Sequence, residues 1–329
     1  MNKLYPLKFK PIFKDKIWGG KKIKTVLKKD FSPLPNCGEV WVLSGVEGNQ
    51  TLIENGFLAG NELNEIVEVF MGDLVGENIY QKFGAEFPIL IKFIDANDWL
   101  SIQVHPDDEL AEKRHNSLGK TEMWYILDAE EGAELISGFS KKVDKEGYQK
   151  HLENKTLKSI LNFEKVKKGD VFYMPSGRVH ALGPGILLAE IQQTSDVTYR
   201  IYDWDRIDEA GMTREIHTEP ALDAIDFKVY DNYKTDYKPK TNKTVKLIES
   251  PYFNTNLIHL TKPLKKDYSE LDSFVIYICA EGKYELRYEE GTIDIEKGEA
   301  LLLPAIFEQV EIYPKAEAKI LEVYMISTK

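Results

Sequence analysis

The sequence predicts a mainly β fold with helical inserts, built from two β-barrel units of one kind. Most of the chain reads as short runs that are alternately or continuously apolar and are separated by turn residues. One pattern also occurs twice: Lys168–Pro175 and Lys297–Pro304 both read Lys-Gly-acid, four mainly apolar residues, then proline. With 329 residues, the chain is long enough for two or three domains.

The first part of the chain begins with strands and continues with helices. Residues 1–45 read as short strands and turns, and Glu39–Ser44 alternates as a strand does. Residues 57–84 are expected to be helical, because Asn61 is a suitable N-cap and apolar residues follow it at helical spacing.

From residue 88 onward the pattern changes to β. Residues 88–94 read as a buried strand, Asn97-Asp98 as a turn and residues 100–105 as the return strand. Further strands are expected at 135–139, 170–174, 186–192 and 198–202. Helices are expected as an insert at about 140–164 and as a short segment at 213–225, and a linker at 230–242. These elements divide the chain into residues 1–230 and residues 231–329.

The second barrel keeps the pattern of the first without its polar side chains. The strand that starts at Glu122 parallels the run Phe274–Cys279, so Phe274 is the expected counterpart of Glu122. The step of five residues from Pro175 to His180 leads in the second copy from Pro304 to Gln309. The second barrel is therefore expected to be degenerate, with a site only in the first.

Composition excludes several classes of protein. The net charge is −11 and no Lys/Arg-rich block occurs, which argues against a nucleic-acid partner. No apolar run approaches membrane-spanning length, so no membrane partner is expected. Cys37 and Cys279 are far apart and lack metal-type spacing, which favours a reducing, cytoplasmic location. The oligomeric state is left open between a monomer and a homodimer.

Four side chains on converging strands make a candidate site for a divalent metal. Gln103 and His105 are two residues apart, so on a strand they share one face. Glu122 adds a carboxylate and His180 a second imidazole, and these are common ligands of divalent metals. Taken alone, a histidine is more often structural, and Glu122 would more often form a surface ion pair with Lys120. Together, the four favour a metal site.

Two other segments carry side chains that suit a pocket. Residues 188–206 are dense in functional groups, including Glu190, Asp196 and Arg200, and they follow the His180 strand directly. The alternative is a solvated edge strand with ordinary ion pairs. Trp18, which lies in a loop next to two glycines, is the tryptophan best placed to line a pocket.

These motifs resemble those of the cupin family. Paired ligands on short strands are followed by Gly-Asp-x4-Pro-x4-His, which ends at His180. The resemblance implies two cupin-type (jelly-roll) β-barrels, the first metal-binding and the second degenerate.

Four motifs in order narrow the resemblance to the type I phosphomannose isomerases, in their short bacterial form. They are Ser-Ile-Gln-Val-His-Pro-Asp (101–107), Gly-Lys-Thr-Glu-Met-Trp-Tyr (119–125), Pro-Ser-Gly-x-Val-His-Ala-Leu-Gly (175–183) and Glu-x5-Asp-x3-Arg (190–200). The match extends to Trp18-Gly19-Gly20 and Gly38-Glu39-Val40-Trp41 near the start. One departure is the compact helical region at 141–163, where longer members carry a separate helical domain.

The resemblance implies roles for individual residues. Gln103, His105, Glu122 and His180 would bind one Zn²⁺ per chain. Arg200, Lys120 and Glu190 would act in catalysis, and the bound substrate would meet Ser101, Lys92, Asp196 and Trp18. Ser101 and Lys92 match positions that contact the substrate phosphate in the family. Among Glu190, Asp196 and Lys120, the residues do not single out the base.

The implied activity is the interconversion of mannose 6-phosphate and fructose 6-phosphate through a cis-enediol. Two alternatives remain open: a cupin-type metal oxygenase, and a non-catalytic cupin that binds a sugar phosphate. The cations Lys120 and Arg200 argue against the oxygenase, and the complete ligand set argues against the non-catalytic protein.

Overall fold

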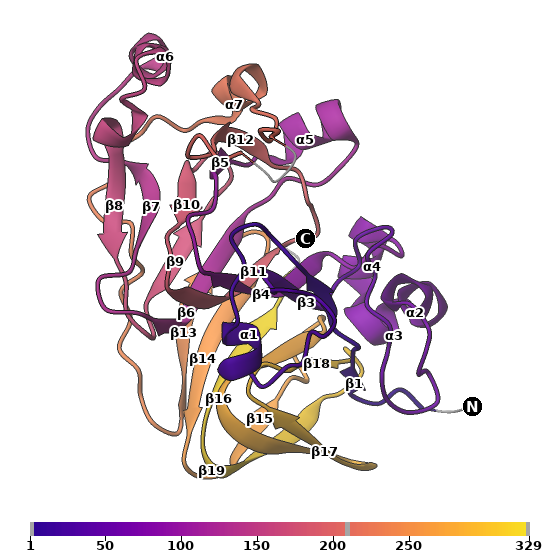
Figure 1. The fold of residues 1–329 in the computed structure, drawn as a ribbon. Helices are drawn as coiled ribbons and strands as arrows, with labels where there is room; N and C mark the ends of the chain where they lie inside the picture. The colour runs from indigo at the N-terminus through magenta and orange to yellow at the C-terminus, as the bar shows by residue number, and fades with distance from the viewer. Residues whose placement is uncertain (1–2, 208–210, 327–329) are drawn as a thin grey trace.

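The structure is a computed structural model that describes residues 3–207 and 211–326. Within these residues the strands form three antiparallel sheets of six, five and eight strands, and the helices are short and lie around them (Figure 1). The prediction of a mainly β fold with helical inserts is confirmed.

The six-stranded sheet is the middle layer of the molecule. Its strands are β2 (Ile12–Lys14), β3 (Glu39–Leu43), β4 (Ile89–Ala96), β11 (Ile186–Gln193), β6 (Glu122–Ala129) and β9 (Val171–Met174), in that order across the sheet. The two central strands, β4 and β11, are buried along their whole length. Both faces of this sheet are therefore covered.

The five-stranded sheet packs against one face of the middle layer. Its order is β12 (Tyr199–Tyr202), β5 (Ile102–Val104), β10 (His180–Leu182), β7 (Glu134–Phe139) and β8 (Leu161–Lys165). Leu135 and Leu182 of this sheet share an apolar cluster with Ile94 and Ile126 of the six-stranded sheet. On the other face, Ile102 and Val104 pack with residues of the nearby helices.

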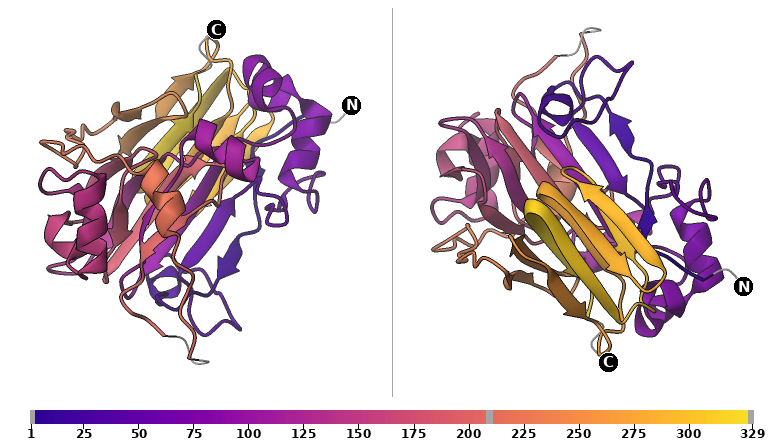
Figure 2. Two further views of the ribbon diagram at one scale, coloured as in Figure 1. Left: turned by 90° about the horizontal axis from the view of Figure 1, so that it is seen from above. Right: turned by 90° about the horizontal axis from the view of Figure 1, so that it is seen from below.

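The eight-stranded sheet lies on the opposite side of the middle layer. Its order is β1 (Leu7–Lys8), β18 (Ala300–Leu303), β16 (Val275–Tyr288), β19 (Gln309–Tyr324), β14 (Asn254–Leu260) and β13 (Lys243–Glu249), while β15 (Leu264–Asp267) pairs with β19 and β17 (Gly291–Glu296) with β16. The largest apolar cluster joins this sheet to the six-stranded sheet. Figure 2 shows the helices of the insert nearest the viewer from above and the C-terminal strands nearest from below.

The helices are α1 (Lys22–Thr25), α2 (Leu63–Phe70), α3 (Gly72–Val75), α4 (Glu77–Phe83), α5 (Asp108–His115), α6 (Lys145–Glu153), the 3₁₀ helix η1 (Leu157–Ile160) and α7 (Thr218–Ala224). The helical region expected at 57–84 is thus three short helices, interrupted at Met71 and Gly76, where the backbone has positive φ. The insert expected at about 140–164 contains α6 and η1 and ends as strand β8.

The predicted barrels are not closed. Within the described residues each of the three sheets has free edges in its strand order, so the pairing does not return to its starting strand. The five- and six-stranded sheets meet face to face through side chains instead, as the layers of a sandwich do.

The strand register corrects one detail of the predicted repeat. Glu122 lies opposite Met174, and the residue opposite Leu303, the counterpart of Met174, is Val275. The counterpart of Glu122 is therefore Val275 and not Phe274. A pattern match cannot fix register to one residue where both strands are continuously apolar.

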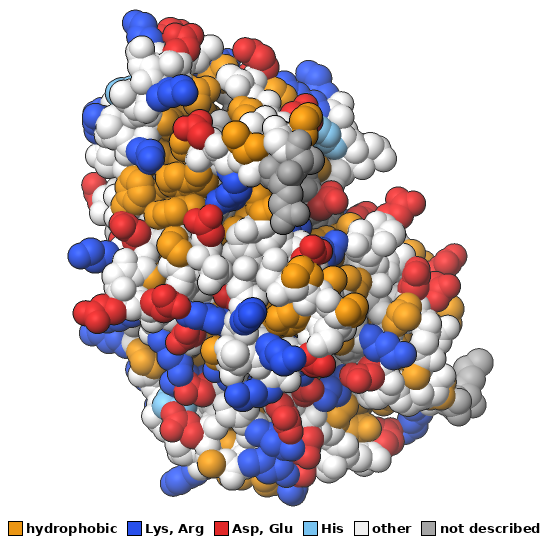
Figure 3. Space-filling view, in the orientation of Figure 1, with side chains coloured by type: hydrophobic (Ala, Val, Ile, Leu, Met, Phe, Trp, Pro, Cys, Tyr) orange, Lys and Arg blue, Asp and Glu red, His pale blue; other side chains and the backbone are white. Residues whose placement is uncertain are grey.

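None of the helices within residues 3–207 and 211–326 is long and apolar enough to span a membrane. Figure 3 shows basic and acidic side chains intermixed over one face of the molecule.

Candidate metal centre and active site

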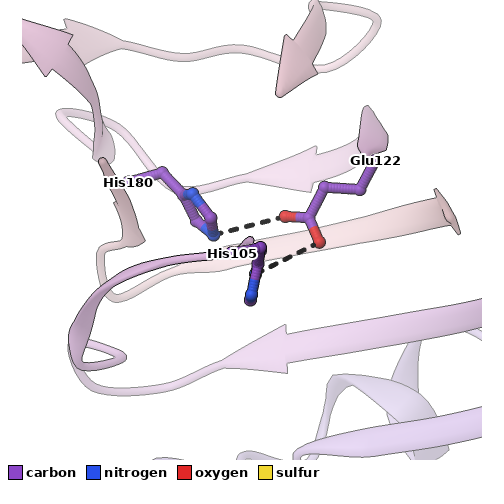
Figure 4. A group of neighbouring side chains, drawn as sticks. All are labelled: His105, Glu122 and His180. Atoms are coloured by element: carbon purple, nitrogen blue, oxygen red, sulfur yellow. Dashed lines mark ion pairs between the residues drawn. The ribbon is translucent and has the colours of Figure 1, made fainter. Parts of the chain in front are cut away.

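His105, Glu122 and His180 form a buried group that suits a metal ion. One nitrogen or oxygen atom from each residue lies within 4.8 Å of the others (Figure 4). His105 Nε2 is 3.6 Å from Glu122 Oε2, and His180 Nε2 is 3.3 Å from Glu122 Oε1. The three side chains therefore converge on one small volume.

Two facing sheets bring these three side chains together. His105 directly follows β5 and His180 begins β10, both in the five-stranded sheet, whereas Glu122 begins β6 of the six-stranded sheet. Gln103 lies directly opposite His180 in the register of β5 and β10, so its amide shares this end of the sheet. Because side chains alternate along a strand, Ile102 and Val104 point into the apolar core on the other face.

Backbone carbonyls fix the tautomer of both imidazoles. His105 Nδ1 is 2.9 Å from the carbonyl oxygen of Val197, and His180 Nδ1 is 2.8 Å from that of Arg178. A carbonyl oxygen only accepts, so each Nδ1 carries the proton and each Nε2 presents a lone pair toward Glu122. This is the orientation that a metal-ligating histidine adopts.

Burial keeps both imidazoles neutral. It lowers the pKa of His180 to about 4, and it lowers the pKa of His105 well below its ordinary value, with the Lys120 ammonium adding to the effect. A neutral imidazole is the form that binds a metal.

Two atoms of the group lack a hydrogen-bond partner. Glu122 Oε2 and His180 Nε2 are both buried without one. Burial, followed by the nearby carboxylate of Glu190, raises the pKa of Glu122 to about 7. A divalent cation would satisfy both atoms and favour the ionised carboxylate. The donor set therefore fits a metal ion.

Lys120 places a positive charge beside this group. Its Nζ is 3.2 Å from His105 Nε2 and 3.3 Å from Glu122 Oε2. Burial opposes the ammonium form, but the carboxylates of Glu122 and Glu190 outweigh it and the pKa of Lys120 is raised. Lys120 is accordingly a cation at neutral pH.

A polar cavity of about 300 Å³ opens next to the metal-ligand group. The sequence-predicted residues that line it are Trp18, Lys92, Ser101, Gln103, Lys120, Glu190, Asp196 and Arg200. The cavity thus gathers all the predicted catalytic and substrate-binding residues, from β4, β5, β11, β12 and the loops between strands.

The cavity also contains residues to which the sequence assigned no individual role: Lys14, Lys16, Glu39, Trp41, Thr198 and Arg214. Glu39 and Trp41 are two residues apart on β3 and so share one face, and the Trp41 indole N–H donates to Glu39 at 2.8 Å. Burial alone would raise the pKa of Glu39, but Lys92 and Lys16 hold it at about 2. The alternation on β3 was the available signal for Glu39. Lys14 and Lys16, in contrast, belong to a strand end and a loop without a pattern.

Two arginines lie on the wall formed by β12 and the loop after it. Arg200 Nη1 donates to the carbonyl oxygen of Glu215 at 2.8 Å, while its Nε is buried without a partner. Arg214 binds Asp203 through two hydrogen bonds, from Nε at 2.7 Å and from Nη2 at 2.5 Å. Asp203 therefore holds the Arg214 guanidinium in a fixed orientation.

Comparisons with known proteins agree with this architecture. Residues 6–143 match the family model of the phosphomannose isomerase type I catalytic domain, and residues 243–324 match the mannose-6-phosphate isomerase cupin domain. Mannose-6-phosphate isomerase ManA of Bacillus subtilis (strain 168) is 37% identical over 308 residues, 91% of this chain and 93% of that protein. The mannose-6-phosphate isomerase of Streptococcus mutans serotype c is 34% identical over 290 residues, 88% of this chain and 89% of that protein.

A solved structure covers almost the whole chain. The crystal structure of mannose 6-phosphate isomerase from Bacillus subtilis superposes with a TM-score of 0.86 at 33% identity, covering 98% of this chain and 99% of that one. Sequence and fold together therefore show that the chain belongs to the type I phosphomannose isomerase family.

Proposed function

We propose that the chain is a zinc-dependent aldose–ketose isomerase that interconverts mannose 6-phosphate and fructose 6-phosphate through a cis-enediol. The observation that carries the proposal is the buried group His105, Glu122 and His180 beside a cavity that holds both carboxylates and cations. The names of the curated relatives support the choice of substrate.

One Zn²⁺ per chain would be held by His105, Glu122, His180 and the amide oxygen of Gln103. Two neutral imidazoles with two oxygen ligands suit zinc, and the buried unpartnered atoms of Glu122 and His180 support this assignment. When bound, the ion would polarise sugar oxygens and stabilise negative charge on them.

The cations of the cavity suit the phosphate and the sugar oxygens. Arg200 and Arg214 offer planar donors that match a phosphate, and Ser101 and Lys92 line the same cavity. Trp18 and Asp196, which also line it, would bind the sugar itself. The phosphate would thereby fix C1 and C2 of the open-chain sugar beside Lys120 and Glu190.

Glu190 is the residue that we assign to proton transfer. In the aldose-to-ketose direction, a base removes the proton from C2, the electron pair forms the C1–C2 double bond and O1 gains a proton. Return of a proton to C1, with loss of the proton from O2, gives the ketose. Lys120 is protonated because its pKa is raised, so it and Arg200 would stabilise the charge on the enediol oxygens.

We also propose that the catalytic part spans residues 1–230 and forms the metal-binding cupin-type unit, while residues 231–329 form a degenerate copy. Val275 and Gln309 stand in the copy where Glu122 and His180 stand in the first unit, so the copy has neither the carboxylate nor the imidazole at these two positions. Cys37 and Cys279 are free and buried, which agrees with the proposed cytoplasmic location.

A coupled assay tests the function directly. Purified protein with zinc and mannose 6-phosphate should produce fructose 6-phosphate, detected by conversion to glucose 6-phosphate and reduction of NADP⁺. The rate should be the same without oxygen, which separates an isomerase from a metal oxygenase. Absence of product from the zinc-loaded protein would refute the proposal.

Arg200→Ala makes the matched variant for this assay. It should keep its zinc, because Arg200 is outside the ligand group, yet lose on the order of 100-fold or more in kcat/KM, as removal of a charge-stabilising donor does. Unchanged catalysis in this variant would remove Arg200 from the mechanism.

A further inference from the structure

The two oxygens of Glu190 have different surroundings. Glu190 lies opposite both Lys92 on β4 and Trp124 on β6 in the strand register. The Trp124 indole N–H donates to Oε2 at 2.9 Å and fixes the carboxylate plane. Oε1 is buried without a hydrogen-bond partner, although the Lys92 ammonium is only 3.3 Å away. Oε2 is therefore engaged in a hydrogen bond, whereas Oε1 has only the ion-pair contact with Lys92.

Lys92 has a closer partner than Glu190. Its Nζ donates to Gln192 Oε1 at 2.7 Å, and both side chains are buried. Gln192 is two residues from Glu190 on β11, so it points to the same face of the sheet. It does not line the cavity, whereas Lys92 and Glu190 do.

The turn after β11 fixes the orientation of the Gln192 amide. Its Nε2 donates to the carbonyl oxygens of Gln193 and Ser195, at 2.8 Å and 2.7 Å. Both amide hydrogens are thus used, and only the oxygen remains to face Lys92. A buried ammonium beside a carboxylate would ordinarily form a short charge-assisted bond, but here the neutral amide has the shorter contact.

We propose that Gln192 is a positioning residue for the isomerisation: it keeps the Lys92 ammonium from forming a short hydrogen bond with Glu190 Oε1, so that this oxygen can accept from the bound sugar. This inference rests on the proposed function, because it assigns Glu190 Oε1 to the substrate. A purely structural role, closing the turn at Gln193–Ser195, is the alternative to be separated from it.

Gln192→Met removes the acceptor for Lys92 at nearly constant side-chain volume. The ion pair of Lys92 with Glu190 Oε1 should then shorten into a hydrogen bond, so that kcat and kcat/KM fall together, on the order of tenfold or more, with a small change in KM. Zinc content should stay at the wild-type value, because the ligands are untouched.

Gln192→Glu separates the two roles. It keeps an acceptor for Lys92 but loses both hydrogens that close the turn, so it should retain more kcat than Gln192→Met. If closing the turn were its sole role, both variants would be equally impaired. Thr194→Val is the matched control, since it removes the bond from Thr194 Oγ1 to the Phe87 carbonyl in the same turn without touching Lys92. It should lower the melting temperature and keep kcat within about threefold.

A double variant tests whether Gln192 acts through Lys92. In a Lys92→Met background the ammonium is gone, so adding Gln192→Met should not reduce kcat further. Independent, additive losses would overturn the proposal, as would a Gln192→Met enzyme with wild-type kcat and a lowered melting temperature.

A crystal structure of Gln192→Met tests the positioning role without any activity measurement. Lys92 Nζ should move to about 2.8 Å from Glu190 Oε1, the distance of a charge-assisted bond. An unchanged separation would refute the positioning role even if wild-type protein had no isomerase activity. Wild-type inactivity alone would instead refute the proposed function.

Discussion

At the scale of single residues, the site combines neutral imidazoles with a carboxylate that lacks a full set of partners. His180 Nε2 and Glu122 Oε2 are buried without a hydrogen bond, and a buried polar group left without one costs about 1–3 kcal/mol. Apolar residues would fill the same space without this cost. The group is therefore built for a ligand and not for stability.

His180→Ala tests this interpretation at the residue scale. Removing one of the proposed ligands should lower bound zinc by more than the roughly 10–100-fold in affinity that outer-shell changes cost, and turnover should be lost with it. Metal content of the purified protein, measured by atomic emission, checks the first effect. His151→Ala is the control. His151 lies on α6 and hydrogen-bonds with Thr156, outside the candidate ligand group, so this variant should keep its full zinc content. Near-stoichiometric zinc in His180→Ala would exclude His180 as a ligand.

At the scale of elements, side chains alternate along the central strands, so that one face contributes to the cavity and the other to the apolar core. Lys92 and Ile94 on β4 line the cavity, whereas Ile91 and Phe93 enter the core shared with the eight-stranded sheet. Asp95, near the end of the same strand, accepts the backbone N–H of Lys22 at 2.5 Å and so anchors the start of α1. Burial raises the pKa of Asp95 to about 6.

Asp95→Asn should reveal this burial as a pH dependence of stability. The folded protein binds the proton of Asp95 more tightly than the unfolded chain, so wild-type stability falls as pH rises from about 4 to about 6. The substituted amide does not titrate, so the free energy of unfolding of the variant relative to wild type should rise across this window by about 2–3 kcal/mol. Urea unfolding at several pH values measures the difference. A difference that stays constant from about pH 4 to about pH 7, a range that spans both pKa values, would contradict the assignment.

At the scale of the whole molecule, the N-terminal part (residues 1–230) and the C-terminal part (residues 231–329) share a core. The strand β1, from the N-terminus, pairs with β18 near the C-terminus, and the largest apolar cluster spans the six- and eight-stranded sheets. Asp272, between β15 and β16, accepts the backbone N–H groups of Glu77 and Asn78 at the start of α4. Gly76 precedes that helix, and a Cβ there would lie 2.5 Å from the Asp272 carbonyl oxygen. We therefore infer that the N-terminal and C-terminal parts unfold together.

Calorimetry of wild type and Asp272→Ala tests this coupling. Wild type should show one unfolding transition, and the variant should lose about 1 kcal/mol from it, because a helix-capping carboxylate is removed. Glu270 is an exposed acid in the same turn, so Glu270→Ala should leave the unfolding temperature unchanged. Two separated transitions, or an effect of Asp272→Ala confined to one of them, would show that the N-terminal and C-terminal parts unfold independently.

The local pattern of the chain was sufficient for the strands and for the ligand types. Gln103 and His105 had to share a face, because a strand alternates its side chains whatever it pairs with. The motif from Gly169 to His180 likewise marked a turn, a strand end and a ligand in order, and the family resemblance followed from it. These inferences needed only neighbours along the chain.

Pairing between distant strands decided what the sequence left open. Register made Val275 the counterpart of Glu122, and it placed Lys92 and Trp124 on either side of Glu190. The cations that complete the cavity, Lys14, Lys16 and Arg214, lie in segments without a periodic pattern, so nothing local marks them. By itself, the sequence determined a mainly β protein of the phosphomannose isomerase family with a candidate metal site. Only the tertiary structure decided which side chains surround the Glu190 carboxylate, because those contacts depend on how separate strands align.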